Sequence, residues 1–107
     1  MSLQYADCIN ACYDCAAACD FCASSCLKED DPGMMRECIR LDMQCASICR
    51  LAAQFMALES SFSTELCTLC AQICEKCAQT CRQHAMDHCQ KCADACERCA
   101  QACRSMA

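Results

Sequence analysis

This chain of 107 residues has little of what shapes a loop-rich protein or a conventional core: one glycine, one proline, no tryptophan and three phenylalanines. Scaffolds held together by disulfides are rich in loops, so the scarcity of glycine and proline argues against that class. No run of 18 or more apolar residues lacks a polar break, so we expect no membrane span. Much of the apolar content is cysteine and alanine, which predicts a core of small side chains.

The charge balance and the first residues exclude further classes. The net charge is −5 and the isoelectric point is about 4.8, whereas nucleic acid attracts basic surfaces. The opening residues, Met-Ser-Leu-Gln-Tyr-Ala-Asp, have neither the basic nor the apolar region of a secretory signal. We therefore expect a cytoplasmic protein that binds neither nucleic acid nor membrane, in a reducing compartment where disulfides are rare.

What the chain does have is nineteen cysteines in helical steps. From Cys67 to Cys81 the cysteines are spaced by three, four, three and four residues, which places them along one face of an α-helix. The same steps recur 22 residues later and again near the N-terminus. The three stripes are Cys8, Cys12, Cys15, Cys19, Cys22 and Cys26; Cys67, Cys70, Cys74, Cys77 and Cys81; and Cys89, Cys92, Cys96, Cys99 and Cys103.

The repeat predicts a single domain over residues 1–107, an all-α, antiparallel up-down-up-down four-helix bundle with a cysteine-lined core. We expect helices over about 3–28, 32–57, 63–84 and 88–105. Asp31 is the predicted N-cap of the second helix, and Ser61 or Ser63 that of the third. The cysteines slip out of phase after Cys81, which predicts a short turn at 85–88 with Asp87 as N-cap. One long helix is the alternative.

The second predicted helix departs from the repeat. The positions equivalent to the stripe read Cys38, Leu41, Cys45, Ile48 and Ala52, with Cys49 beside them. We expect Leu41 and Ile48 to be ordinary core residues. Further apolar residues suggest that this helix buries a second face, as a contact between subunits would: Ile39, Met43, Leu51, Phe55 and Met56.

Several roles for the thiols fit the pattern poorly. A disulfide framework would leave one cysteine unpaired, because the number of cysteines is odd. In addition, Cβ atoms four residues apart on a helix are about 5–6 Å apart, whereas a disulfide needs about 3.5–4.5 Å. A thiol redox buffer needs exposed cysteines of low pKa, whereas these stripes are expected to face inward. Several four-thiolate zinc sites, each with a double negative charge, would accumulate charge inside a narrow core. Iron–sulfur clusters are bound by cysteines that wrap around the cluster from loops, whereas these cysteines lie along helices.

Copper(I) suits the pattern better, because it is a soft, monovalent ion that thiolates bind well. If sulfurs bridge neighbouring ions, one Cu(I) replaces one thiol proton and the core stays near neutral. Silver(I) would do the same in vitro. The sequence thus favours high-capacity storage or detoxification of Cu(I) without catalysis. A redox buffer, a zinc-binding protein and a plain structural bundle remain the alternatives.

The thiol-lined helices, the absence of a signal and the corner Cys81-x2-His84-x3-His88-Cys89 resemble the cytosolic branch of the bacterial copper storage proteins. The resemblance covers nearly the whole chain. It implies homotetramers of four-helix bundles that each hold many Cu(I) ions. It also implies that the three stripes, together with Cys38, Cys45 and Cys49, are the ligands. We also expect delivery of copper by a copper chaperone or a small thiol, and no enzymatic activity, because no nucleophile–base constellation can be singled out among so many equivalent thiols.

One end of such a bundle collects ligands of another kind. In the predicted topology the first and third helices end where the second and fourth begin, which gathers His84, Met86 and His88 near Cys26, Cys38, Cys89, Met34 and Met35. The opposite end has no histidine. Neutral imidazole and thioether bind Cu(I) more exchangeably than bridging thiolate, so we interpret His84, Met86 and His88 as an entry port. The alternative is that both histidines only cap or solvate a turn.

Overall fold

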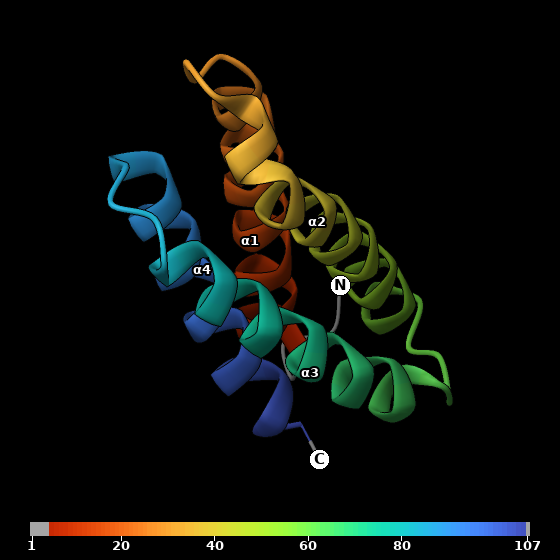
Figure 1. Ribbon diagram of the computed structural model, residues 1–107. Coiled ribbons are helices and arrows are strands. Elements are labelled where there is room, and N and C mark those ends of the chain that lie inside the picture. Colours follow the sequence, from red (N-terminus) through yellow and green to blue (C-terminus); the bar gives the residue numbers. More distant parts are fainter. Residues whose placement is uncertain (1–4, 107) are drawn as a thin grey trace.

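Four antiparallel helices pack side by side in a computed structural model that describes residues 5–106 (Figure 1). The elements are α1 (Ala6–Leu27), the 3₁₀ turn η2 (Pro32–Met35), α2 (Arg36–Ala57), α3 (Ser63–Arg82) and α4 (Asp87–Arg104). Helix α1 packs against α2 and α4, and α3 packs against the same two helices. The bundle measures 44 × 18 × 18 Å. The predicted all-α, up-down-up-down fold with a cysteine-lined core is confirmed.

Local sequence explains why these segments are helical. The residues between the cysteines are largely alanine, glutamine, glutamate, lysine and arginine, which favour helix. Alanines beside the thiol stripes, such as Ala53 and Ala93, are fully buried, so neighbouring helices approach closely around a core of small side chains. None of the described helices is both long and apolar enough to cross a membrane.

The helix beginnings differ from the predictions. The predicted start of the first helix at residue 3 lies outside the described residues, and α1 begins at Ala6. Asp31 precedes a 3₁₀ turn rather than an α-helix, and its side chain makes no capping hydrogen bond. The prediction of Ser61 or Ser63 as N-cap of α3 is wrong, because Phe62 occupies that position. The Ser63 hydroxyl instead donates to the Ser60 carbonyl at 2.8 Å, which ties the turn to itself.

The connection between α3 and α4 is a short turn over residues 83–86, slightly earlier than predicted. Helix α3 ends at Arg82, and just beyond it the His84 backbone amide donates to the Cys81 carbonyl at 3.1 Å. Met86, in extended conformation, is the N-cap of α4, and its carbonyl accepts from the Cys89 and Gln90 amides. Asp87 is therefore already helical, and its prediction as the N-cap is wrong. This turn resets the helical phase so that Cys89 is buried in the core.

Helix α2 ends in a Schellman motif. The Ser60 amide donates to the Phe55 carbonyl and the Glu59 amide to the Met56 carbonyl, both at 3.0 Å. Glu59 has a φ of 56°, the left-handed conformation that the position after a helix usually reserves for glycine. The chain thus reverses into α3 without using its single glycine.

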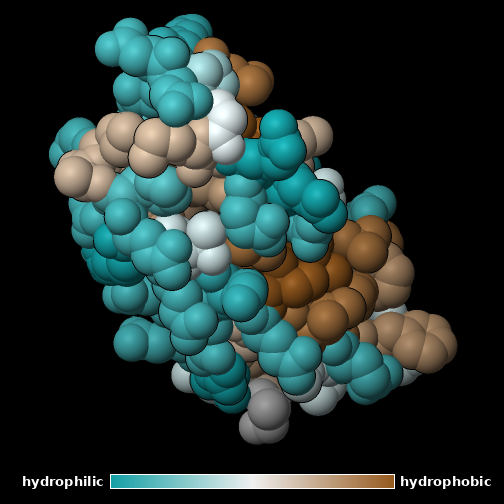
Figure 2. All heavy atoms as spheres, viewed as in Figure 1, coloured by the Kyte–Doolittle hydropathy of each residue, from teal (hydrophilic) through white to brown (hydrophobic). Residues whose placement is uncertain are grey.

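Helix α2 leaves an apolar strip on the surface. Met43 is 59% exposed and Leu51 is 41% exposed, and with Ile48 and Ile73 they line a shallow groove of about 470 Å³ beside α3. Figure 2 shows hydrophobic residues gathered in a hollow on one face of the bundle. Met56, by contrast, is fully buried inside the bundle.

Candidate metal centre

The thiol stripes of all four helices meet along the axis of the bundle. All nineteen cysteines lie within the described residues, and every one is a buried free thiol. The sulfurs are close across helix boundaries: Cys38 Sγ lies 3.3 Å from Cys81 Sγ, and Cys45 Sγ lies 3.5 Å from Cys74 Sγ. The core is therefore a continuous column of sulfur rather than a set of separate pairs.

Sulfur spacing along a single helix suits a soft metal ion. Sγ atoms four residues apart lie 4.0 Å apart for Cys15 and Cys19 and 3.9 Å apart for Cys70 and Cys74. An ion bound to three sulfurs at about 2.3 Å would hold them about 4.0 Å apart. One helix turn therefore presents two sulfurs at the separation that a trigonal thiolate site requires, and a neighbouring helix supplies the third.

The sulfurs gather into groups that share members. Within each group all sulfurs lie within 4.8 Å of one another; among them are Cys12, Cys70, Cys99 and Cys103; Cys15, Cys49, Cys74 and Cys99; Cys15, Cys19, Cys45 and Cys96; Cys19, Cys77, Cys92 and Cys96; and Cys22, Cys26, Cys38 and Cys89. The first four groups are linked through shared thiols. Isolated four-thiolate zinc sites would not share ligands in this way, whereas clusters of monovalent ions use bridging sulfurs.

A buried carboxyl group lies in this column, and the sequence interpretation missed it. Asp42 is fully buried, and its Oδ1 accepts hydrogen bonds from the thiols of Cys77, Cys81 and Cys92 at 3.3, 3.5 and 3.3 Å. Its Oδ2 accepts from Cys38 at 3.8 Å. Asp42 thus joins the linked groups to the group at the histidine end.

The phase of the α2 stripe was the missed signal. The core-facing positions advance by four, three, four, three and four residues through Cys38, Asp42, Cys45, Cys49, Ala52 and Met56. Placing Leu41 and Ile48 in the stripe is therefore wrong, although Leu41 is buried at the edge of the core. Ile48 is only partly buried and lines the surface groove.

Burial raises the pKa of three groups at or near the histidine end of the column. Desolvation, followed by the nearby Cys92 and Cys77 thiols, raises the pKa of Asp42 from 3.8 to about 10, so the carboxyl group is neutral at pH 7. Desolvation, followed by the nearby Cys38 thiol, raises the pKa of Cys89 to about 11 and also raises the pKa of Cys26. These groups therefore stay protonated at neutral pH unless a cation is buried with them.

His88 contacts the thiols at one end of the column. Its Nδ1 lies 3.5 Å from Cys22 Sγ, 3.5 Å from Cys89 Sγ and 4.0 Å from Cys26 Sγ. Its Nε2 lies 3.0 Å from Glu29 Oε1. The imidazole thus reaches the thiol group formed by Cys22, Cys26, Cys38 and Cys89 from the α4 side.

His84 and Met86 lie outside that thiol group. Both line a surface pocket of about 250 Å³ with Met34, Met35 and the acidic residues at 29–31. His88 is thus the predicted entry residue whose ring nitrogen lies 3.5–4.0 Å from buried sulfurs, while Met86 packs against the edge of the core cluster. The sequence groups the two histidines by helical phase, but α3 ends before His84 and the phase is lost there.

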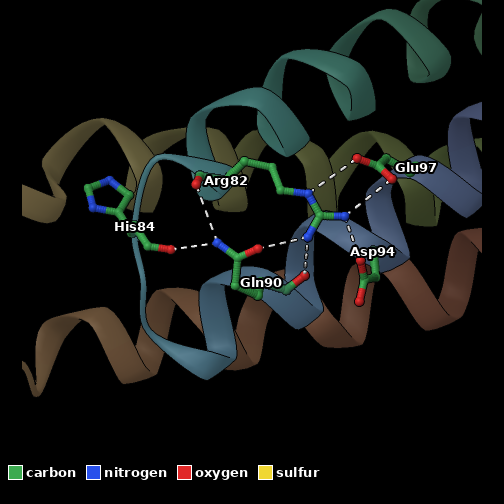
Figure 3. Close-up of polar contacts among 5 residues, drawn as sticks. All are labelled: Arg82, His84, Gln90, Asp94 and Glu97. Carbon is green, nitrogen blue, oxygen red and sulfur yellow. Dashed lines mark hydrogen bonds and ion pairs between the residues drawn. The ribbon is translucent and has the colours of Figure 1, made fainter.

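A polar network on the outside fixes the turn that carries His84 (Figure 3). The side-chain Nε2 of Gln90 donates to the His84 carbonyl at 2.7 Å and to the Arg82 carbonyl at 3.3 Å. The Arg82 guanidinium bonds Gln90 in return and pairs with Asp94 and Glu97 on α4. In Figure 3 the His84 imidazole points away from this network, which His84 joins through its backbone carbonyl alone.

The opposite end of the column has a different ligand set. Cys8 Sγ lies 3.8 Å from Cys103 Sγ, and Cys67 Sγ donates to Met56 Sδ at 3.6 Å. Both histidines of the chain lie at the other end. The predicted difference between the two ends is therefore present in the structure.

Fold and core together define a class of protein: a four-helix bundle whose interior is a thiol column suited to soft monovalent metal ions. The family model described as "Csp: Copper storage protein" matches residues 1–107. The chain belongs to the copper storage protein family.

Solved structures agree with this assignment. The Cu(I)-bound copper storage protein BsCsp3, from Bacillus subtilis, is 50% identical with a TM-score of 0.93, over 96% of this chain and 97% of that chain. A cytosolic copper storage protein from Streptomyces lividans, described with five coppers, is 36% identical with a TM-score of 0.91, over 94% of this chain and 89% of that chain.

A curated relative matches over a shorter stretch. The cysteine-rich protein YhjQ of Bacillus subtilis is 51% identical over 65 residues, and the match covers 60% of this chain and 60% of that protein.

The buried carboxyl group leads to a prediction about pH. Because the folded-state pKa of Asp42 is raised, the folded, metal-free protein holds one more proton than the unfolded chain between pH 3.8 and about 10. The stability that this proton contributes is full below pH 3.8 and is lost as pH rises towards 10. The free energy of unfolding should therefore fall by up to about 1.4 kcal/mol per pH unit between pH 5 and 7.5, and Asp42→Asn should remove this slope.

Urea unfolding of the reduced protein at several pH values measures this slope. Asp14→Asn, a substitution at an exposed position of α1, is the matched control and should retain the wild-type slope. Parallel curves for wild type and Asp42→Asn would show that Asp42 does not take up the extra proton.

Proposed function

We propose that this chain is a single storage domain that holds many Cu(I) ions in its thiol column, for storage or detoxification and without catalysis. The observation that carries the proposal is the sharing of sulfurs between neighbouring four-thiol groups. Shared sulfurs allow ions to be bridged into clusters along the axis. A redox buffer is disfavoured because all nineteen thiols are buried.

Charge supports a monovalent ion over a divalent one. A thiol loses its proton when a metal binds, so one Cu(I) per thiolate leaves the core near neutral. A zinc ion held by four thiolates would leave two negative charges in a column where, among residues 5–106, no lysine or arginine is buried and His88 contacts the thiols at one end.

We assign the ligands from the geometry of the column. All nineteen cysteines are proposed as Cu(I) ligands, with His88 as a nitrogen ligand at the end group. His84 and Met86, together with the exposed Met34, form the proposed port, because imidazole and thioether bind Cu(I) exchangeably. Asp42 supplies an oxygen within the column, where a soft ion prefers the surrounding sulfurs.

The setting of the protein is proposed on separate grounds. We place it in the cytoplasm, where thiols stay reduced and a copper chaperone or a small thiol can deliver Cu(I). A homotetramer is supported by the apolar groove on α2 and α3, which a neighbouring subunit could cover. The net charge of −5 disfavours nucleic acid as a partner.

The capacity for copper tests the proposal. Anaerobic titration of reduced protein with Cu(I) should continue well beyond the one or two ions of a discrete site. Replacing both Cys74 and Cys96 by serine should lower the loading by a few ions, because each sulfur serves only its own part of the column. Metal per chain after gel filtration gives the loading, and circular dichroism shows whether the helices remain.

Ala46→Ser is the matched control, since it adds a hydroxyl group to the buried core without removing a sulfur. Saturation of the wild type at one or two ions would contradict storage. Complete loss of binding from Cys74→Ser alone would instead indicate one discrete site.

The port leads to a kinetic prediction. Replacing both His84 and His88 by alanine should slow Cu(I) loading, and removal of Cu(I) by a competing chelator, while the final capacity changes little. Stopped-flow transfer measures both rates. Met106→Ala, at the opposite end of the bundle, should leave the rates unchanged. Unaltered rates in the double variant, or a large loss of capacity, would place the entry elsewhere.

A further inference from the structure

Glu29 contacts the one histidine that reaches the thiol column. Its Oε1 lies 3.0 Å from His88 Nε2, while His88 Nδ1 faces the sulfurs of Cys22, Cys26 and Cys89 on the other side of the ring. The His88 side chain is only 13% exposed and that of Glu29 is 32% exposed, so the contact is partly shielded from water. The imidazole is therefore held between a carboxylate and a group of thiols.

This arrangement decides which nitrogen of His88 can bind a metal. A neutral imidazole carries one N–H, and a carboxylate oxygen accepts hydrogen bonds but does not donate them. The contact with Glu29 therefore places the proton on Nε2 and leaves the Nδ1 lone pair directed at the sulfurs of the end group. With the proton on Nδ1, the ring would offer no lone pair to an ion among those sulfurs.

The backbone holds Glu29 in place for this contact. Its amide donates to the Cys26 carbonyl at 3.2 Å, directly after the end of α1. Cys26 belongs to the same group of thiols that His88 contacts. The backbone of Glu29 is thus tied to the end of the column that His88 contacts.

We propose that Glu29 is a positioning residue: it fixes the ring orientation and the tautomer of His88, so that Nδ1 is ready to accept Cu(I) at the end of the thiol column. The role in transfer rests on the proposed storage of Cu(I). The contact itself is present in the structure at 3.0 Å. Carboxylates that orient histidine ligands in this way commonly affect metal affinity or activity by about 10–100-fold.

Substitutions separate orientation from charge. Glu29→Ala removes the acceptor, Glu29→Gln keeps an oxygen acceptor without the charge, and Asp30→Ala removes a neighbouring acidic group from the same loop. If Glu29 positions His88, Glu29→Ala should slow transfer of Cu(I) from its acetonitrile complex about tenfold, whereas Glu29→Gln and Asp30→Ala should stay near the wild-type rate. If Glu29→Gln and Asp30→Ala slow transfer as much as Glu29→Ala, acidity of the loop is the cause and the proposal is overturned.

A double-variant cycle tests whether Glu29 acts through His88. In a His88→Ala background, adding Glu29→Ala should change the transfer rate little, because the group that Glu29 orients is gone. A full tenfold further loss in that background would show that Glu29 acts by another route and would overturn the proposal.

The metal-free protein provides a readout that does not depend on copper. Long-range proton–nitrogen NMR spectra should show the His88 proton on Nε2 alone in the wild type and in Glu29→Gln. In Glu29→Ala the two ring-nitrogen shifts should move towards each other as both tautomers become populated. An unchanged His88 spectrum in Glu29→Ala would overturn the proposal even if the protein stores copper. If the His88 spectra are as expected but the protein binds few Cu(I) ions, the storage proposal would be contradicted while the role of Glu29 in orienting His88 would stand.

Discussion

Electrical neutrality of the sulfur column is the constraint on which the rest of this structure depends. Nineteen buried thiols share the interior of a bundle only 18 Å across, and each uncompensated charge there would cost on the order of several kcal/mol. In the metal-free protein, protons meet the constraint: burial raises the pKa of Cys89 to about 11 and that of Asp42 to about 10. A monovalent metal ion can take the place of a proton without adding net charge, which a divalent ion cannot do.

The packing of the bundle follows from the same column. Alanines such as Ala53 and Ala93 beside the stripes let the helices approach until sulfurs on different helices lie 3.3–3.9 Å apart. A bound ion would take the place of hydrogen atoms between sulfurs that are already close. The helices are held together by helix propensity, buried apolar surface and polar contacts such as that of Arg82 with Glu97.

Much of this architecture could be predicted from the sequence, because three repeated stripes with alternating steps of three and four fit only one helix face. Helix α2 was harder, since its stripe contains Asp42 where a cysteine or an apolar residue is expected, and Leu41 and Ile48 fit a neighbouring phase. The predicted N-caps of α3 and α4 were wrong because Phe62 and Met86 occupy these positions, and neither makes the side-chain capping hydrogen bond on which the prediction relied. The contact between Glu29 and His88 joins residues 59 positions apart, and no spacing rule predicts it.

The most direct test of the account is the number of protons released for each Cu(I) bound. Reduced protein in weakly buffered solution near neutral pH would be titrated anaerobically with the Cu(I)–acetonitrile complex, which releases no protons of its own, while a pH-stat records the base consumed. The account predicts close to one proton per ion throughout the loading, because each ion replaces one proton of the column. A release near two protons per ion would contradict it, since the core would then accumulate negative charge, and so would a release near zero, since the thiols would then not be the ligands.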